Sequence, residues 1–410
     1  MIDLLLRECR LADGEEPVHL AIADGRIAAL GPEAPAAREV IEVDGRLVTP
    51  GLVEAHIHLD KALLHDRVRA TAGTAAEAIR LTGEAKRGFT VEDIRARARR
   101  VLDMAIAAGT TAMRSHVEVD PILELSALEA ILPLKAEYSP ALDLQICAFA
   151  QEGILQAPGT EGLLRRALTR GADLVGGCPY NDTDARRHIE IVFALAQAFD
   201  VDVDFHIDFF DEPDHLHVRD VIDATVRAGW QGRVCVGHLT ELAALPIPEQ
   251  EAIVADLAAA RIGVIALPTT DLYLMGRGDD VNIRRGITPI RRLLDAGVPV
   301  ALGTNNIRNP FTPIGTADLA DLTFLTTVAA HMGGAREMRM LLDTITVHPA
   351  RMLGLPDYGL APGCRANLLV WDCEGPEDAV ATSPPRVLSI KDGRVTIEHE
   401  RRIRERWREG

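Results

Sequence analysis

The sequence lacks the cysteine patterns that build disulfide frameworks and zinc fingers. Its six cysteines include no Cys-x-x-Cys pair, and several lie within apolar runs such as LQICAFA. Buried free thiols of a cytoplasmic protein are therefore expected. No stretch reaches about 18 uninterrupted apolar residues, and the start MIDLLLRECR has no basic region ahead of its short apolar run. Neither a membrane span nor a signal peptide is expected.

The sequence is also short of positive charge and of phosphate-binding motifs. Lysine and arginine number 44 against 61 aspartates and glutamates, which gives a net charge of −17. Such an acidic chain argues against nucleic acid or an anionic membrane as the main partner. No Gly-x-Gly-x-x-Gly follows the first strand expected in the central region, and no Walker-type loop is present, which disfavours a nucleotide cofactor.

Both ends of the chain carry the same turn signal. Asp-Gly stands between apolar residues at 24–25, 44–45 and 392–393. Asp-Gly in this setting predicts a β-hairpin. We expect residues 1–48 and 359–410 to form one small β-sandwich domain. The arginine-rich end from Arg401 onward is expected to be a solvated helix or a frayed tail.

The middle of the chain, residues 49–358, alternates short β-type runs with amphipathic helices. One helix is expected over 90–109, with Thr90 as its N-cap and Gly109 at its end. Others are expected over 185–200 and 287–297. Eight strands alternating with helices over about 300 residues predict a (β/α)8 barrel of the TIM type. A doubly wound open sheet is the alternative. The expected strands begin at residues 52, 110, 144, 173, 202, 233, 262 and 299.

Histidines stand at the expected carboxyl ends of these strands, where barrel enzymes build their sites. His56 and His58 are two apart on one strand, so both side chains face the same side and can bind one metal ion. His206 ends the fifth strand and is expected to be a third ligand. Asp208 follows it by two positions on the same face. His238 ends the sixth strand, where a neutral imidazole can hold the attacking water or polarise a carbonyl.

Other polar residues at these ends support weaker predictions. His116 ends the second strand, and a structural or supporting role is expected for it. His215 and His217 show the same spacing but begin a helix, where such a pair does not share a face, so we place them on the surface. Gln151 ends the third strand, where an amide suits hydrogen bonding to an amide or amidine edge. An ordinary loop glutamine is an equally good interpretation of Gln151.

At this point the sequence resembles the amidohydrolase superfamily, and within it the cytosine deaminase-like branch, which includes enzymes that remove alkylamines from triazine rings. The similar segments include PGLVEAHIHLDK, RSHVEVD, AFAQEGIL, LMGRGDDVNIRRGIT, NPFTPIGTADL and YGLAPGCRANLLV. The resemblance implies one metal ion with ligands at His56, His58, His206 and Asn305. It implies that His238 contacts the water on the metal and that Gln151 touches the substrate ring.

The sequence departs from this branch where acids are expected. The position of Asn305 holds an aspartate in the branch, which binds the metal and takes the proton from water. Cytosine deaminases carry a second acid at the position of Asn306 and a proton-shuttling glutamate at that of Phe209. An amide in place of a carboxylate ligand should weaken metal binding and make the bound water more acidic.

Three explanations of Asn305 are open from the sequence. Asp208 could relay the proton in a working site; the site could have lost hydrolysis and only bind a ligand; or the residue could be an engineered Asp→Asn change. The last two would leave a barrel that binds a heterocycle without turning it over.

The predicted function is a metal-dependent amidohydrolase or deaminase that cleaves a C–N bond of a small nitrogen heterocycle or cyclic amide. A hydroxide on one divalent transition metal, zinc or iron, would attack a carbon held by Gln151 and Asn306. His238 would stabilise the developing oxyanion or orient the hydroxide, and Asp208 would pass the proton to the leaving amine. Phe209 would make the pocket more apolar, as an alkylated ring requires. Because related enzymes are often oligomers, a homo-oligomer is one expectation.

Overall fold

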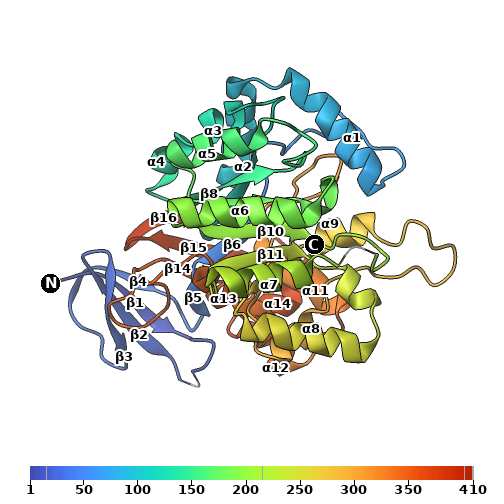
Figure 1. Cartoon of the computed structure of the whole chain (residues 1–410). Coiled ribbons are helices and arrows are strands. Elements are labelled where there is room, and N and C mark those ends of the chain that lie inside the picture. The colour runs from blue at the N-terminus through green and yellow to red at the C-terminus, as the bar shows by residue number, and fades with distance from the viewer. Residues whose placement is uncertain (15, 215, 401, 409–410) are drawn as a thin grey trace. The chain divides into compact units, whose positions relative to one another are not determined.

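The computed structural model describes residues 1–14, 16–214, 216–400 and 402–408. Its internal contacts divide the chain into two compact units. One unit combines the two chain ends, Met1–Gly51 and Asp357–Gly410, and the other is continuous, Leu52–Pro356. Figure 1 shows the first unit in blue and red and the second in the intermediate colours.

The unit made from the chain ends contains two four-stranded sheets. Strands in the first sheet follow the order β3-β2-β1-β4, and strands in the second follow β16-β15-β14-β5. Buried apolar residues from both sheets, such as Leu6, Ile22, Leu368 and Ile390, form one core. The predicted β-sandwich is therefore confirmed. The strands are β1 Ile2–Cys9, β2 Val18–Ala23, β3 Arg26–Gly31, β4 Ala37–Glu42, β5 Val48–Pro50, β14 Leu368–Trp371, β15 Arg386–Lys391 and β16 Arg394–Glu398.

The three Asp-Gly turns differ in what they connect. All three have positive φ at both residues, which is the conformation of the tight turns between hairpin strands. The turn at 24–25 joins the antiparallel pair β2 and β3, and that at 392–393 joins β15 and β16. The hairpin predicted at 44–45 is wrong, because β4 pairs with β1 and β5 pairs with β14. The same turn there passes the chain from one sheet to the other.

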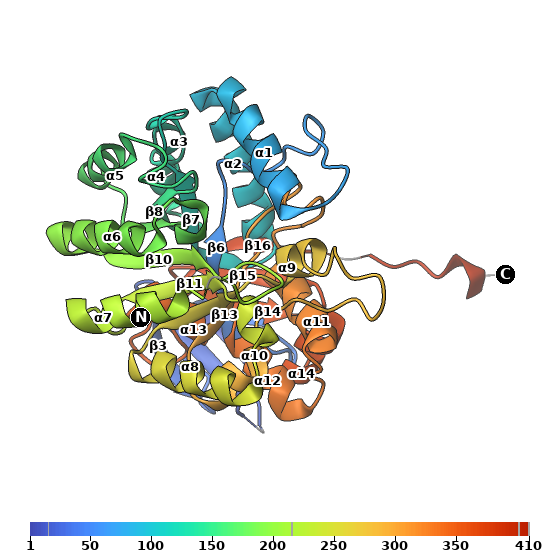
Figure 2. The same ribbon diagram turned by 45° about the vertical axis from the view of Figure 1, so that its right-hand side comes forward.

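The continuous unit is an eight-stranded parallel barrel. Its strands follow one another in sequence order from β6 to β13. A bridge between Ile57 and Asn305 joins the first strand to the end of the last and closes the sheet. The predicted (β/α)8 barrel is confirmed (Figure 2). The strands are β6 Leu52–Ile57, β7 Thr110–Glu118, β8 Asp143–Ala150, β9 Leu174–Gly177, β10 Asp202–Ile207, β11 Val234–His238, β12 Gly263–Ala266 and β13 Val300–Leu302.

Helices lie on the outer side of this barrel, as α5, α6, α7 and α8 show in Figure 2. Thr90 caps α2 as predicted, because its hydroxyl accepts a hydrogen bond from the Asp93 amide. The helices of this unit are α1 Ala75–Ala85, α2 Val91–Ala107, α3 Ser126–Ile131, α4 Leu134–Tyr138, α5 Thr160–Thr169, α6 Ala185–Phe199, α7 Val218–Ala228, α8 Ile247–Ala259, α9 Pro268–Leu274, α10 Ile290–Asp295, α11 Leu319–Ala329, α12 Ala335–Asp343 and α13 Val347–Met352.

The remaining parts of the chain agree with simple expectations. Helix α14, Pro376–Thr382, belongs to the first unit. All six cysteines are free thiols. Within the described tail, residues 406–408 form a single 3-10 turn, whereas Arg401 lies outside the described residues. No helix among the described residues is long and apolar enough to cross a membrane.

Candidate metal centre and active site

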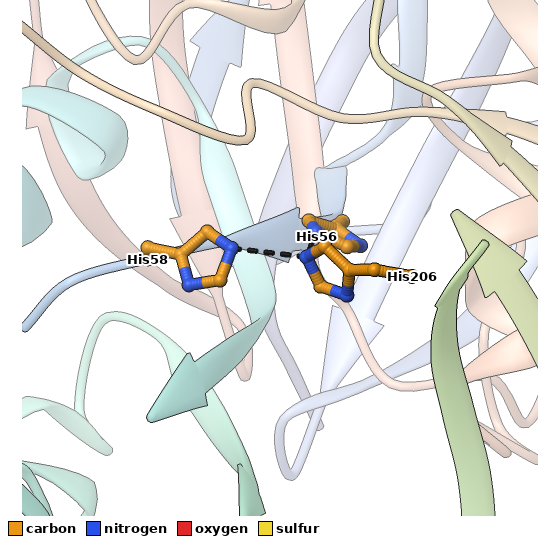
Figure 3. Close-up of side chains that lie close together, drawn as sticks. All are labelled: His56, His58 and His206. Atoms are coloured by element: carbon orange, nitrogen blue, oxygen red, sulfur yellow. Dashed lines mark hydrogen bonds between the residues drawn. The ribbon is translucent and has the colours of Figure 1, made fainter. Parts of the chain in front are cut away.

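Three histidines meet at the carboxyl ends of the barrel strands. His56 lies on β6, His58 follows the end of that strand, and His206 lies on β10. The Nε2 atom of His206 is 2.8 Å from Nε2 of His56 and 3.1 Å from Nε2 of His58. Figure 3 shows the rings pointing toward one another. The structure therefore brings together the three ligands predicted from spacing and strand position.

This cluster fits a divalent metal ion better than it fits a hydrogen-bonded core. All three side chains are nearly fully buried, and burial holds the pKa of each imidazole well below its usual range. Neutral imidazole nitrogens are metal ligands. Two nitrogens that each bind zinc at about 2.1 Å lie about 3.4 Å apart in a tetrahedral site. The two Nε2 separations observed here, 2.8 and 3.1 Å, are somewhat shorter than that value.

Asn305 lies beside this cluster at the seam of the barrel. Its backbone N–H donates to the backbone carbonyl of His56 at 2.8 Å, and its backbone carbonyl accepts from the backbone N–H of His58 at 2.9 Å. The side-chain Oδ1 is buried and has no hydrogen-bond partner among the described residues. A buried amide oxygen without a partner is costly, so Oδ1 is available as a further ligand of a bound cation.

Glu54, which the sequence analysis did not single out, ties the two sides of this seam together. Its carboxylate accepts hydrogen bonds from the backbone amides of His56, at 2.9 Å, and Thr304, at 3.1 Å. Burial raises the pKa of Glu54 to about 7. Glu54 precedes His56 by two positions on the same face of the strand, so the pattern of alternate residues could have identified it.

His116, for which a structural or supporting role is expected, packs against the histidine cluster. Its ring stacks on that of His56 with 3.9 Å between centroids, and its Nε2 is 3.3 Å from Asp204 Oδ1. Asp204 also pairs with Arg114 at 2.9 Å. These fully buried groups fill the barrel interior beneath the site and limit the rotation of the His56 ring.

A second polar arrangement at the barrel mouth is formed by His238 and a residue that the sequence analysis missed. The Nδ1 atom of His238 is 2.8 Å from Oδ1 of Asp271, which lies on α9 directly after β12. Both residues are buried, and burial raises the pKa of the Asp271 carboxyl. The ring of His238 lies 5.4 Å from that of His206. The barrel mouth thus holds a carboxylate–imidazole pair next to the histidine cluster.

The structure does not bring Asp208 to the histidine cluster. Asp208 follows the end of β10 with a positive φ of 52°, so the alternation of the strand no longer sets its direction. Its two carboxylate oxygens accept from the backbone amides of His217, at 2.7 Å, and Val218, at 3.1 Å. Asp208 therefore satisfies amides at the start of α7, and the geometry leaves the predicted proton relay without support.

His217 precedes α7 and is half-buried, so the prediction that it lies on the surface is only partly confirmed. His215 lies outside the described residues. Neither position contributes to the His56, His58 and His206 cluster.

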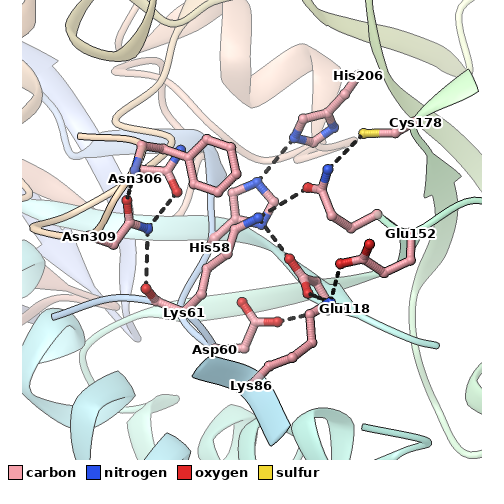
Figure 4. Close-up of polar contacts among 12 residues, drawn as sticks. His58, Asp60, Lys61, Lys86, Glu118, Glu152, Cys178, His206, Asn306 and Asn309 are labelled. Atoms are coloured by element: carbon pink, nitrogen blue, oxygen red, sulfur yellow. Dashed lines mark hydrogen bonds and ion pairs between the residues drawn. The ribbon is translucent and has the colours of Figure 1, made fainter. Parts of the chain in front are cut away.

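Gln151, predicted to contact the substrate, follows β8 and is held at both ends of its amide. Oε1 accepts from Lys61 Nζ at 3.1 Å, and Nε2 donates to Cys178 Sγ at 3.5 Å. Lys61 also pairs with Glu118 at 2.8 Å (Figure 4). Lys61 ends the segment PGLVEAHIHLDK, but nothing in its spacing indicates a buried partner.

A buried lysine fills the acidic cluster behind this group. Lys86 Nζ lies 2.6 Å from Glu118, 2.9 Å from Asp120 and 2.6 Å from Glu152. These three carboxylates are close enough to hold a metal ion by their spacing alone. Because the ammonium group of Lys86 already lies among them, the cluster is an ion-pair network, and the pKa of Glu118 is lowered to about 2 mainly by Lys61 and Lys86 against the effect of burial.

Asn306 and Phe209 line the same region in different ways. Asn306 Oδ1 accepts from Asn309 Nδ2 at 2.7 Å, and Asn309 in turn donates to the carbonyl of Lys61. The ring of Phe209 lies 4.0 Å from that of His238 between centroids. Phe209 belongs to an apolar cluster with Ala78, Leu274, Met275 and Phe311. An apolar wall therefore borders His238.

One cleft of the barrel unit lies apart from these residues. It has a volume of about 1420 Å³ and is lined mainly by residues of α8, α10 and the segment 283–289. None of the predicted site residues lines it. Volume alone therefore does not locate the chemistry of this protein.

Fold and site together define a class, an α/β barrel with a histidine cluster suited to a divalent metal at the carboxyl ends of its strands. The chain belongs to the amidohydrolase family, whose model matches residues 39–397. This family assignment confirms the resemblance seen in the sequence.

Several similar proteins act on substituted heterocycles. The chain is 28% identical over 408 residues to an N-isopropylammelide isopropyl amidohydrolase from Pseudomonas sp. (strain ADP). The matched region covers 97% of this chain and 98% of that protein. It is 26% identical to a pterin deaminase from Rhizobium rhizogenes, with 94% and 89% covered. A 5-methylcytosine deaminase from Klebsiella pneumoniae, liganded with phosphonocytosine, is 33% identical with a TM-score of 0.93 and 98% and 99% covered.

Proposed function

We propose that this protein is a metal-dependent amidohydrolase that removes an amino or alkylamino group from a ring carbon of a small nitrogen heterocycle. The observation that carries the proposal is the convergence of three buried imidazole Nε2 atoms beside the His238–Asp271 pair. The names of the similar proteins support it, since one is an isopropyl amidohydrolase of N-isopropylammelide and the other two are deaminases.

His56, His58 and His206 would hold the metal, with Asn305 Oδ1 as a fourth ligand. The metal would supply Lewis acidity, which makes water more acidic and polarises the carbon under attack. Zinc and iron(II) both suit imidazole and oxygen ligands. With an amide in place of a carboxylate, the ligand set carries no negative charge, so the full charge of the cation acts on water and substrate.

His238 would handle the proton. Asp271 accepts the hydrogen on Nδ1, which keeps the proton on that nitrogen and leaves a lone pair on Nε2. Nε2 would take a proton from the attacking water and deliver it to the departing nitrogen, while the ring carbon gains oxygen and loses the C–N bond. This assignment gives the proton transfer first predicted for Asp208 to His238, oriented by Asp271, because the Asp208 carboxylate accepts from two backbone amides at the start of α7.

The apolar wall would select substrates with an alkyl substituent. Phe209 and Phe311 lie in one cluster with Leu274 and Met275, and Phe209 contacts His238. An apolar wall of this kind favours a methyl or larger alkyl group by about 0.8 kcal/mol for each buried methylene. Gln151 and Asn306 would contact the polar edge of the ring.

We expect metal-loaded protein to turn over at least one alkylated heterocycle from a short panel. The panel comprises 5-methylcytosine, N-isopropylammelide and pterin, with cytosine as the matched compound without the methyl group. Released ammonia or alkylamine would be quantified after incubation with zinc or iron(II), and metal content would be measured by plasma mass spectrometry. The proposal fails if metal-loaded protein releases no amine from any of them.

A second function is favoured by one observation, the absence of an acid at position 305. The chain would then bind a heterocycle without converting it. The change Asn305→Asp separates the two functions. In a working site it adds an unneeded anionic ligand and should lower kcat/KM about tenfold. A large gain of activity would instead show that the present site is a degenerate form of an aspartate-dependent enzyme.

A further inference from the structure

The backbone at the end of β11 has an uncommon conformation. His238 has a φ of 73° and Leu239, the next residue, a φ of 60°, so two consecutive residues other than glycine are left-handed. This region is unfavourable for them because the Cβ atom crowds the following carbonyl oxygen. A strained backbone persists only where neighbouring groups hold it. At His238 this backbone sets the direction of the imidazole, whose ring lies 5.4 Å from that of His206.

Hydrogen bonds from two sides hold this strand end. On the side of β10, the backbone N–H of Leu239 donates to the carbonyl of Ile207 at 3.2 Å. On the other side, the hydroxyl of Thr288 donates to the carbonyl of His238 at 2.5 Å. Only 1% of the surface of Thr288 is exposed, so water does not compete for this short hydrogen bond.

Thr288 belongs to the segment between α9 and α10, which is itself closely packed. Gly286, two residues earlier, lies so near Met275 that a Cβ atom added at this glycine would be 2.1 Å from the Met275 Cβ. The carbonyl of Thr288 accepts from the backbone N–H of Ile290, the first residue of α10, at 2.8 Å. The position of the Thr288 hydroxyl is therefore set by its own segment, and the strand end of β11 is held against it.

We propose that Thr288 is a positioning residue for His238. By holding the carbonyl of His238, its hydroxyl keeps the left-handed backbone in which Nδ1 reaches Asp271 at 2.8 Å. Without this hydrogen bond the backbone relaxes toward an ordinary strand conformation and turns the imidazole away from Asp271. Misplacing a catalytic group by about 1 Å lowers turnover by about 10²-fold. This inference rests on the proposed function, since it concerns the proton transfer assigned to His238.

Replacing Thr288 by valine removes the hydroxyl and nearly keeps the shape of the side chain. In metal-loaded Thr288→Val, kcat should fall by about 10- to 100-fold, while KM and metal content stay within about twofold of the wild type. Thr288→Ser restores a hydroxyl donor and should return kcat to within about threefold of the wild type. The matched control is Thr225→Val, which removes a buried hydroxyl that donates to the Val221 carbonyl within α7 at 2.7 Å. It should keep the wild-type kcat.

Two further measurements distinguish positioning from a general loss of stability. Thr288 and Asp271 act on the same imidazole, so kcat of the double variant Thr288→Val/Asp271→Asn should lie within about threefold of that of Asp271→Asn alone. The proton on Nδ1 of His238 can be followed by NMR without substrate, after assignment by its loss in His238→Gln. It should persist in Thr288→Ser and exchange rapidly with water in Thr288→Val. Thr288→Ala carries the same expectation if the valine variant does not fold.

A wild-type kcat in Thr288→Val, or independent effects of the two changes in the double variant, would overturn the proposal and leave the hydrolase function standing. Absence of turnover in the wild type would overturn the proposed function instead. The NMR comparison then tests the positioning of His238 by itself, and an Nδ1 proton unchanged in Thr288→Val would overturn the role of Thr288.

Discussion

Replacing Asp271 by asparagine should lower kcat by about 10²- to 10⁴-fold, the range that a positioned general base contributes. In the wild type the carboxylate accepts the hydrogen on His238 Nδ1 at 2.8 Å. An asparagine amide can donate to that nitrogen instead, which moves the imidazole hydrogen to Nε2. The lone pair that should receive the proton of water is then lost, although the shape of the site is preserved.

The measurement combines steady-state kinetics with metal content and a thermal unfolding scan. Asp271→Asn should bind metal as the wild type does, because Asp271 contacts His238 and belongs to no ligand group. Asp208→Asn is the matched control, a buried aspartate that caps α7, and it should keep kcat within about threefold. If Asp208→Asn lost most turnover while Asp271→Asn kept it, the proton-handling roles of the two residues would have to be exchanged.

Removing one imidazole of the cluster should abolish both metal binding and activity. His206 Nε2 lies within 3.1 Å of both other nitrogens, and His206→Ala leaves only two imidazoles, both from one chain segment. Metal content should fall from near one equivalent to below about a tenth. Activity should fall at least about 10³-fold, since a catalytic metal supplies several kcal/mol of transition-state stabilisation.

The control for this change is an exposed histidine outside the site, and His331→Asn serves because the residue is exposed. It should keep both metal and activity. Circular dichroism would verify that His206→Ala retains its fold. A folded His206→Ala variant that still bound one equivalent of metal and turned over substrate would contradict the proposed ligand set.

Much of the fold could be predicted because its signals are local. Alternating apolar runs and helical periodicity identified all eight barrel strands, and Thr90 marked the start of α2. The turn at Asp44 shows the limit of such signals. Its conformation follows from its two residues, but the partners of the strands on either side follow from packing far along the chain, where β14 pairs with β5.

The site was predictable where a side chain points along the regular strand and unpredictable beyond it. His56 and His206 lie within strands, so position alone placed them at the mouth. Asp208 lies one residue past its strand with a positive φ, and there the alternation fails. Asp271 and Lys61 matter through partners far away in sequence, His238 and Gln151, and no local pattern announces such contacts.

At Asn305, the closure of the barrel depends on backbone atoms, whereas the chemistry of the site depends on the side chain. The seam uses only the main-chain amide and carbonyl of this residue, which bond to His56 and His58. Its left-handed backbone, with φ of 56°, is one that asparagine and aspartate both tolerate. Either side chain can therefore occupy the position without opening the seam. The charge at this position beside the histidine cluster could change during evolution, or by design, independently of the stability of the barrel.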